Sequence, residues 1–243
     1  IGLLFIPEKD SKEKINSQNI ADKKILDKIG VSNQFTKGFA WLYGTIVNPL
    51  LSFFKKNTIS VALSILGFVF LFKIGEAFLG RMSLVFYKEI GFSKTDIALY
   101  SKGIGWITTV TFTLLGGLFA VRMGLVKAMF LSGVFMALTN ILFSVLAWVG
   151  NSEILFAFTV LIDDLAAAFA TVAFVGFISA LVDRNYTATQ YALLASIGTL
   201  GRTLFASSSG MMVDWLNGNW IIFFIITALM VIPSLIFLFL IRS

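Results

Sequence analysis

The chain has 243 residues, of which 58% are hydrophobic and only 13% are charged, and its formal net charge is +6. Soluble domains carry about 25% charged residues, so this composition indicates an integral membrane protein. Cys and His are both absent, which excludes disulfides, Cys/His metal centres, thiol catalysis and imidazole proton relays. Any proton chemistry must therefore use carboxylates. The sequence predicts no cofactor and no metal site, and it offers no nucleophile–base pair that would favour an enzyme.

The N-terminal segments divide by composition. Residues 1–6 are apolar and are interpreted as the end of a truncated transmembrane helix, and residues 7–56 as a cytoplasmic linker, strongly polar up to residue 33. From residue 34 to residue 54 apolar side chains recur near helical spacing, with lysines on either side. This pattern predicts an amphipathic helix on the inner leaflet, broken around Pro49. The alternative interpretation is an ordinary juxtamembrane linker.

Residues 57–243 contain six apolar stretches, which we expect to be transmembrane helices. They cover residues 58–86, 95–119, 126–149, 153–182, 188–213 and 219–241. At about 29 residues the first stretch exceeds the roughly 30 Å hydrocarbon core, so it must tilt, bend or project beyond it. Ser93 and Asp96, between the first two stretches, have the spacing of a capping box at the start of a helix.

The lysines and arginines beside and between these stretches are distributed unevenly. Thirteen lie in the segments on the side of the N-terminus, against only Lys88 and Lys94 on the other side. The positive-inside rule therefore predicts a multi-pass protein with both termini in the cytoplasm. This distribution also makes nucleic acid a poor explanation of the positive net charge.

A weak internal repeat relates the first three stretches to the last three. Residues 74–76, Ile-Gly-Glu, correspond to residues 162–164, Ile-Asp-Asp, and the segment that begins at Thr95 is echoed by the one at Thr189. Because the second triplet enters the membrane from the opposite face, the pattern predicts a 3+3 inverted repeat, as many secondary transporters have.

Seven charged side chains lie inside the apolar stretches and more than two residues from their ends, where each costs about 2.5–3.5 kcal/mol even on the most lenient insertion scale. They are Lys73, Glu76, Arg81, Lys102, Asp163, Asp164 and Arg202. Counted along the helices, four of them lie roughly 15–17 Å deep, near the midplane: Glu76, Asp163, Asp164 and Arg202. Arg81 is close to a helix end and is set aside, because it can snorkel to the surface.

Acidic and basic side chains from separate helices at one depth predict a shared polar cavity, the place where secondary transporters bind substrate. Glu76 and Asp163 are the expected proton-binding or substrate-binding carboxylates. Lys102 and Arg202 are the expected partners of an anionic group.

Two adjacent carboxylates argue against simple pairing. Asp163 and Asp164 point about 100° apart on a helix, so one partner cannot readily serve both, and one of them is expected to face the cavity. The alternative is that three acids neutralise three bases, with Lys73 as the third base, and only hold the helices together. Trp106 shares a helix face with Lys102. An indole beside a cation suits an anionic sugar, and core packing is the other interpretation of this tryptophan.

The most distinctive stretch is residues 187–194, Thr-Ala-Thr-Gln-Tyr-Ala-Leu-Leu, supported by Lys102 with Gly105, by the pair at 116–117 and by Gly-Arg at 201–202. On these residues the chain from about residue 57 onward resembles the C-terminal half of the muropeptide permease (AmpG-type) family of the major facilitator superfamily. In that family's pattern an Asp takes the place of Glu76. A Glu-Asn pair followed by several glycines stands where this chain has its two aspartates followed by alanines.

The resemblance implies a twelve-helix, proton-coupled importer of anhydromuropeptides in the bacterial inner membrane, of which residues 57–243 are the last six helices. The partners that it implies are the lipid bilayer, an N-terminal six-helix half, protons and a small-molecule glycopeptide substrate. The alternative function is a non-transporting remnant, sensor or assembly partner whose buried charges only pair.

Overall fold

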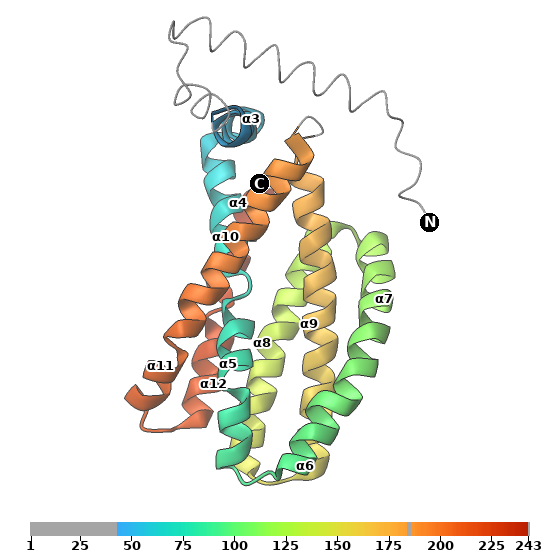
Figure 1. The fold of residues 1–243 in the computed structure, drawn as a ribbon, viewed down its shortest axis with the longest axis vertical. Helices are drawn as coiled ribbons and strands as arrows, with labels where there is room; N and C mark the ends of the chain where they lie inside the picture. The colour runs from blue at the N-terminus through green and yellow to red at the C-terminus, as the bar shows by residue number, and fades with distance from the viewer. Residues whose placement is uncertain (1–42, 184–185, 243) are drawn as a thin grey trace, which may run out of the picture. The chain divides into compact units, whose positions relative to one another are not determined.

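A computed structural model describes residues 43–183 and 186–242 (Figure 1). The predicted truncated helix at 1–6 and the linker up to residue 42 lie outside the described residues. So do positions 184, 185 and 243 and several side chains, those of Lys102 and Trp106 among them. Within the described ranges every regular element is a helix and none is a strand. This confirms the prediction of an all-α protein.

The chain divides into two compact units, which are described separately. The smaller unit comprises Ile1–Ile59 and Val182–Leu193 and contains η2 (Tyr43–Val47), α3 (Asn48–Lys56) and the start of α10 (Thr187–Ser207). The larger unit comprises Ser60–Leu181 and Leu194–Ser243. Its elements are α4 (Ile59–Leu71), α5 (Ile74–Glu89), α6 (Lys94–Asp96), η3 (Ile97–Ile104), α7 (Gly105–Met123), α8 (Leu125–Val149), α9 (Glu153–Leu181), α11 (Ser209–Trp215), α12 (Trp220–Leu229) and α13 (Ile232–Arg242).

Four helical segments of the described chain are long and apolar enough to cross a membrane. They are Ile59–Glu89, Leu125–Val149, Glu153–Leu181 and Trp220–Ile241. They correspond to the first, third, fourth and sixth predicted spans. The second predicted span forms η3 and α7, whose apolar part, Ile107–Met123, is shorter, and the fifth forms the helices α10 and α11. The protein is therefore an all-helical, multi-pass membrane protein.

The first span is interrupted near its middle. α4 ends at Leu71, α5 begins at Ile74, and Phe72 and Lys73 form a turn between them. Lys73 caps α5 with φ −96° and ψ 14°, outside the helical range. A bend is one of the outcomes that the excess length of this span requires. The interruption places Lys73 and Glu76 at the start of a helix deep inside an apolar segment.

Two turns at one end of the larger unit fix the direction of its helices. Ser93 and Asp96 form the predicted capping box, with each side chain accepting a hydrogen bond from the other residue's backbone N–H. Asn151 donates from Nδ2 to the carbonyl oxygen of Gly91 at 2.9 Å. The end of α5 therefore lies beside the start of α9, and these two helices run in opposite directions (Figure 1).

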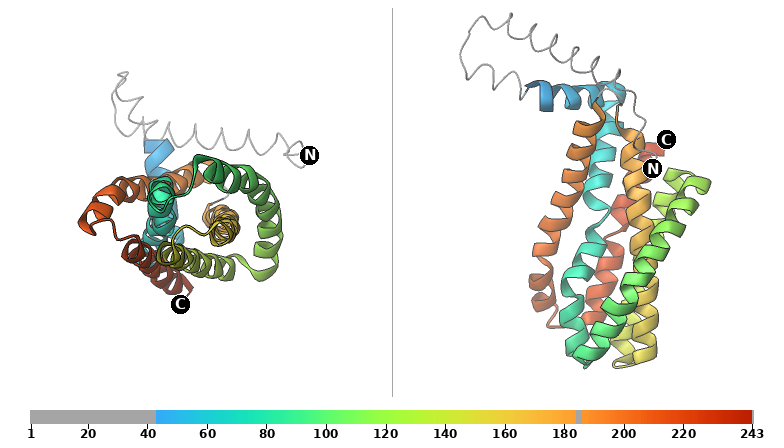
Figure 2. Two further views of the ribbon diagram at one scale, coloured as in Figure 1. Left: turned by 90° about the horizontal axis from the view of Figure 1, so that it is seen from below. Right: turned by 45° about the vertical axis from the view of Figure 1, so that its right-hand side comes forward.

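An aromatic cluster holds α5, α8 and α12 together at the same end. The ring of Phe86 lies 4.7 Å from that of Phe224 and 5.3 Å from that of Trp220. Trp220 also donates from Nε1 to Glu89 Oε2 at 2.7 Å, which gives the indole N–H a partner. α9 packs along α7 and α8, and α12 packs on α8 and α5 (Figure 2). These contacts position the helices that carry the charged side chains of the apolar segments.

Candidate functional site

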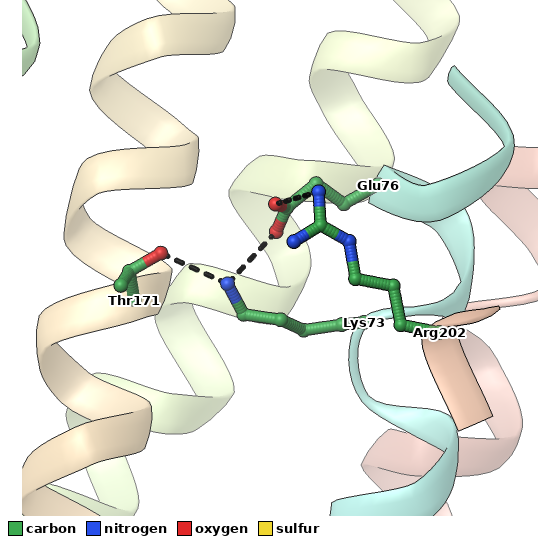
Figure 3. A network of polar contacts seen from close by, with 4 residues as sticks. All are labelled: Lys73, Glu76, Thr171 and Arg202. Atoms are coloured by element: carbon green, nitrogen blue, oxygen red, sulfur yellow. Dashed lines mark hydrogen bonds and ion pairs between the residues drawn. The ribbon is translucent and has the colours of Figure 1, made fainter. Parts of the chain in front are cut away.

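Three charged side chains and one threonine meet at the interruption of the first span (Figure 3). Lys73 Nζ lies 3.2 Å from Glu76 Oε2, and Arg202 Nη2 lies 3.8 Å from Glu76 Oε1. Lys73 Nζ also donates to Thr171 Oγ1 at 2.9 Å. The four side chains, called the ion network below, come from the α4–α5 turn, α5, α9 and α10. The structure thus brings Glu76 together with two of the three expected bases.

The ion network holds one more positive charge than negative charge. The side chains of Lys73 and Glu76 are 14% and 19% exposed, whereas that of Arg202 is 51% exposed. A separation of 3.8 Å is too long for a hydrogen bond, and among the described residues no acceptor is hydrogen-bonded to the Arg202 guanidinium. Arg202 is therefore the loosely held cation of the network, with donors that can turn to another anion.

Glu76 itself is held by charge more than by hydrogen bonds. Its Oε2 atom is buried and has no hydrogen-bond partner among the described residues, although Lys73 lies within ion-pair distance. Its two oxygens are therefore held by ion pairs with Lys73 and Arg202.

The adjacent aspartates, called the carboxyl pair below, point in different directions, as their separation of about 100° predicts. Asp164 accepts a hydrogen bond from Thr108 Oγ1 of α7 at 2.9 Å. A Cβ atom at Gly105 would lie 3.0 Å from Asp164 Oδ2, so the absence of a side chain there lets α7 approach this carboxyl closely. Asp163, the preceding residue of α9, points about 100° away from Asp164 and so does not share the Thr108 contact.

The carboxyl pair lies closer to the start of α9 than Thr171 of the ion network does. Asp164 and Thr171 are seven residues apart, which is roughly 10 Å along a helix axis. The four charges expected at a single depth thus lie at two neighbouring levels, Glu76 and Arg202 in the ion network and the carboxyl pair beside Thr108.

The side chains of Lys102 and Trp106 lie outside the part of the chain that the structure describes. Their backbones belong to η3 and to the first turn of α7. η3 is a π-helix, and π-helical segments are rare and frequent at functional sites. It is continuous with the helix turn that carries Thr108, the partner of Asp164. Arg81, which was set aside as a snorkelling residue, is exposed.

Sequence reasoning missed the threonines that serve these charges. Thr171 and Thr108 contribute hydroxyls from α9 and α7 to Lys73 and Asp164. Their only signal was polarity inside an apolar helix, and most hydroxyls of this kind bond to their own backbone, as Thr113 does. Asn140 of α8 is another polar side chain inside an apolar helix. It is 2% exposed, and its Oδ1 atom has no hydrogen-bond partner among the described residues.

Comparisons with known proteins identify relatives that are named as transporters. No family model matches the chain. A candidate transporter named AmpG 4 from Rickettsia conorii is 34% identical over 204 residues, which cover 82% of this chain and 47% of that protein. Its counterpart in Rickettsia felis is 34% identical over 208 residues, covering 84% and 48%. The anhydromuropeptide permease of Escherichia coli strain K12 is 27% identical over 199 residues, covering 82% and 40%.

These relatives are membrane transport proteins by name, the class that the apolar helices and buried charges indicate. The chain is a homologue of the AmpG-type permeases, which confirms the resemblance predicted from its sequence. It spans about half the length of the curated relatives that it matches.

Proposed function

We propose that the chain is the six-helix half of a proton-coupled secondary transporter that imports anhydromuropeptide-like cell-wall fragments across the bacterial inner membrane. The substrate class is that named for the Escherichia coli relative. The observation that carries the proposal is the ion network, because it places a carboxylate between two cations at the interruption of a membrane span. The match to about half of each relative supports a second, N-terminal six-helix half as partner.

In this proposal the six helical segments form two inverted triplets, with both termini in the cytoplasm. The segment η3–α7 is the second span, and α10–α11 is the fifth. Transporters built from inverted repeats bind substrate and coupling ions near the bilayer midplane, where their helices are interrupted. The turn at Phe72–Lys73 supports this arrangement, since it lies near the middle of the longest apolar segment and directly beside Glu76.

Proton uptake by Glu76 is the coupling step that we propose. A neutral Glu76 leaves Lys73 and Arg202 without a counterion, and an anionic substrate group then restores the charge balance. Arg202 is the cation that would turn to the substrate, because it is half exposed and its contact with Glu76 is long. Lys73 would stay in place, because Thr171 also holds it. Proton and substrate therefore favour each other's binding, which is the linkage that symport requires.

The carboxyl pair and the side chains of Lys102 and Trp106 complete the proposed site. Asp163 and Asp164 would form the second level of a polar path, about two turns of α9 from Thr171 of the ion network. The buried and unpartnered oxygen of Asn140 supports such a path, because water or substrate on the path would satisfy it. Lys102 and Trp106 would meet the anionic group and the sugar of the substrate.

Uptake of a labelled anhydromuropeptide tests this function. The chain is expressed in a strain that lacks its own muropeptide permease, with and without an N-terminal six-helix half. We expect uptake only with both halves, since alternating access moves one half against the other.

Glu76→Gln is expected to abolish the pH dependence of uptake. Glu153→Gln, a change to an exposed acid at the start of α9, is the matched control and is expected to preserve it.

The non-transporting alternative makes the opposite forecast. If the charges only pair, the two halves together give no uptake. The only effect of Glu76→Gln is then a lower free energy of unfolding. An unchanged pH dependence in Glu76→Gln, with transport intact, would remove Glu76 from the coupling step.

A further inference from the structure

A polar pocket of ≈ 500 Å³ lies within the smaller unit, apart from the ion network and the carboxyl pair. Its lining residues are Asn48, Leu51, Ser52, Lys55, Lys56, Asp183 and Tyr186. Five of them follow one another at helical spacing along a single face of α3. The other two belong to the segment between α9 and α10. The proposed transport mechanism uses none of these side chains.

The pocket is built by hydrogen bonds that fix α3 to the start of α10. Gln190 is only 3% exposed; it donates from Nε2 to the Pro49 carbonyl at 2.9 Å and accepts at Oε1 from the Asp183 N–H at 2.6 Å. Ser52 Oγ donates to Asp183 Oδ2 at 3.1 Å. The walls of the pocket are therefore held in place without any ligand. Gln190 belongs to the stretch 187–194 that first indicated the family.

The charge of the pocket suits an anion. Lys55 and Lys56 are exposed and form the last turn of α3, and in the described part of the chain neither forms an ion pair. The lining has two lysines and one acid, and the acid already accepts a hydrogen bond from Ser52. Lysine ammonium groups, with amide and hydroxyl donors from Asn48 and Tyr186 beside them, are the groups that bind phosphate oxygens.

Chain connectivity places this pocket at the membrane boundary. Lys56 precedes Ile59, the first residue of an apolar span, by three residues, and Asp183 follows Leu181, the last residue of another span, by two. Three residues of chain reach at most about 10 Å. Leu51, 43% exposed, lies one helical turn from Lys55 on the same face of α3. A ligand with a phosphate and an adjoining acyl chain would contact both.

We propose that this pocket binds the phosphate of an anionic phospholipid headgroup, with Lys55 and Lys56 as its main ligands and the acyl chains beside Leu51. A soluble phosphate ester carries the same charged group and would enter the same pocket from water. The lipid is the source that the exposed leucine and the neighbouring span ends favour. The experiment therefore needs a lipid arm and a soluble arm.

Thermal unfolding of the purified full chain in detergent measures this binding. The probes are dihexanoyl-phosphatidylglycerol, dihexanoyl-phosphatidylcholine and glycerol phosphate, each titrated to saturation. We expect phosphatidylglycerol to raise the unfolding midpoint saturably and phosphatidylcholine to have a much smaller effect. In the double variant Lys55→Gln/Lys56→Gln the apparent affinity for phosphatidylglycerol should fall about fivefold for each lysine removed. The matched control, Lys88→Gln/Lys94→Gln, should leave it unchanged.

Each other outcome has a defined meaning. A saturable shift with glycerol phosphate as large as that with the lipid, lost in the double variant, would keep the phosphate site but overturn its assignment to lipid. The same affinity in the double variant, or an equal loss in the control variant, would overturn the site altogether. Tyr186→Phe provides a second test if the double variant does not fold, and it should weaken binding severalfold through loss of one hydroxyl donor.

Discussion

Glu76 has two cationic partners, which differ in their distance from its carboxylate and in their exposure. Lys73 is close to it, largely buried and tied to Thr171, whereas Arg202 is half exposed and farther away. Lys73 already neutralises the largely buried Glu76, so the half-exposed Arg202 is not needed to balance a buried charge. The loose contact of Arg202 therefore favours a site that exchanges partners.

The hydroxyl of Thr171 is expected to keep Lys73 in place during that exchange. Thr171→Val removes the hydrogen bond at nearly constant volume and should lower anhydromuropeptide uptake by the two halves about fivefold, the effect of one hydrogen bond of about 1 kcal/mol. Thr113→Val is the control, because Thr113 is exposed and its hydroxyl bonds only to the carbonyl of Thr109 in its own helix. Equal uptake by the two variants would mean that Lys73 needs no anchor.

The ion network depends on how closely α10 approaches the interrupted span formed by α4 and α5. A Cβ atom at Gly201 would collide with the carbonyl oxygen of Phe70, at the end of α4. The backbone of α10 therefore lies directly against the backbone next to the turn at Lys73. Close approach through small residues is how membrane helices associate without a hydrophobic driving force. Because Arg202 is the next residue, this contact also sets its reach to Glu76.

Gly201→Ala is expected to push α10 away from α4. Overpacking of this kind costs about 1–3 kcal/mol, so the free energy of unfolding should fall by that amount, and uptake should fall further because Arg202 is displaced. Gly80→Ala on α5 is the matched control, since among the described residues no atom outside its own stretch of helix lies within 4 Å of its Cβ position. Denaturant unfolding of the two variants checks the prediction, and an equal stability of both would contradict the close approach.

At the scale of the whole molecule, four segments are apolar enough to be recognised as spans by length and composition, and two are not. The fifth predicted span carries Arg202 and several hydroxyl residues, so its hydropathy is low for the same reason that it contributes to the site. The second is short because its first part is the π-helix η3. Hydropathy is thus weakest in the helices that we expect to line a polar path.

A six-span topology with cytoplasmic termini predicts alternating accessibility along the chain. Since the protein has no cysteine, single cysteines can be introduced at the helix ends and labelled with a membrane-impermeant maleimide. Cysteines at Lys94, Ser152 and Trp215 should react from the periplasmic side, and those at Thr58, Lys127 and Ala188 only after the membrane is permeabilised. Labelling of Ala188 and Trp215 from the same side would show that α10–α11 does not cross the membrane.

The sequence by itself determined the membrane class, the family, the capping box at Ser93 and the identity of the buried charges. Each of these follows from composition, spacing or the cost of a charge in hydrocarbon, which are properties of a residue and its neighbours along the chain. Only the tertiary structure decided which charges meet. The partners of Glu76, Lys73 and Asp164, namely Arg202, Thr171 and Thr108 respectively, lie on other helices. Spacing along one helix gives the depth and face of a side chain, but contact between helices depends on backbone approaches such as that at Gly201, which a single sequence does not reveal.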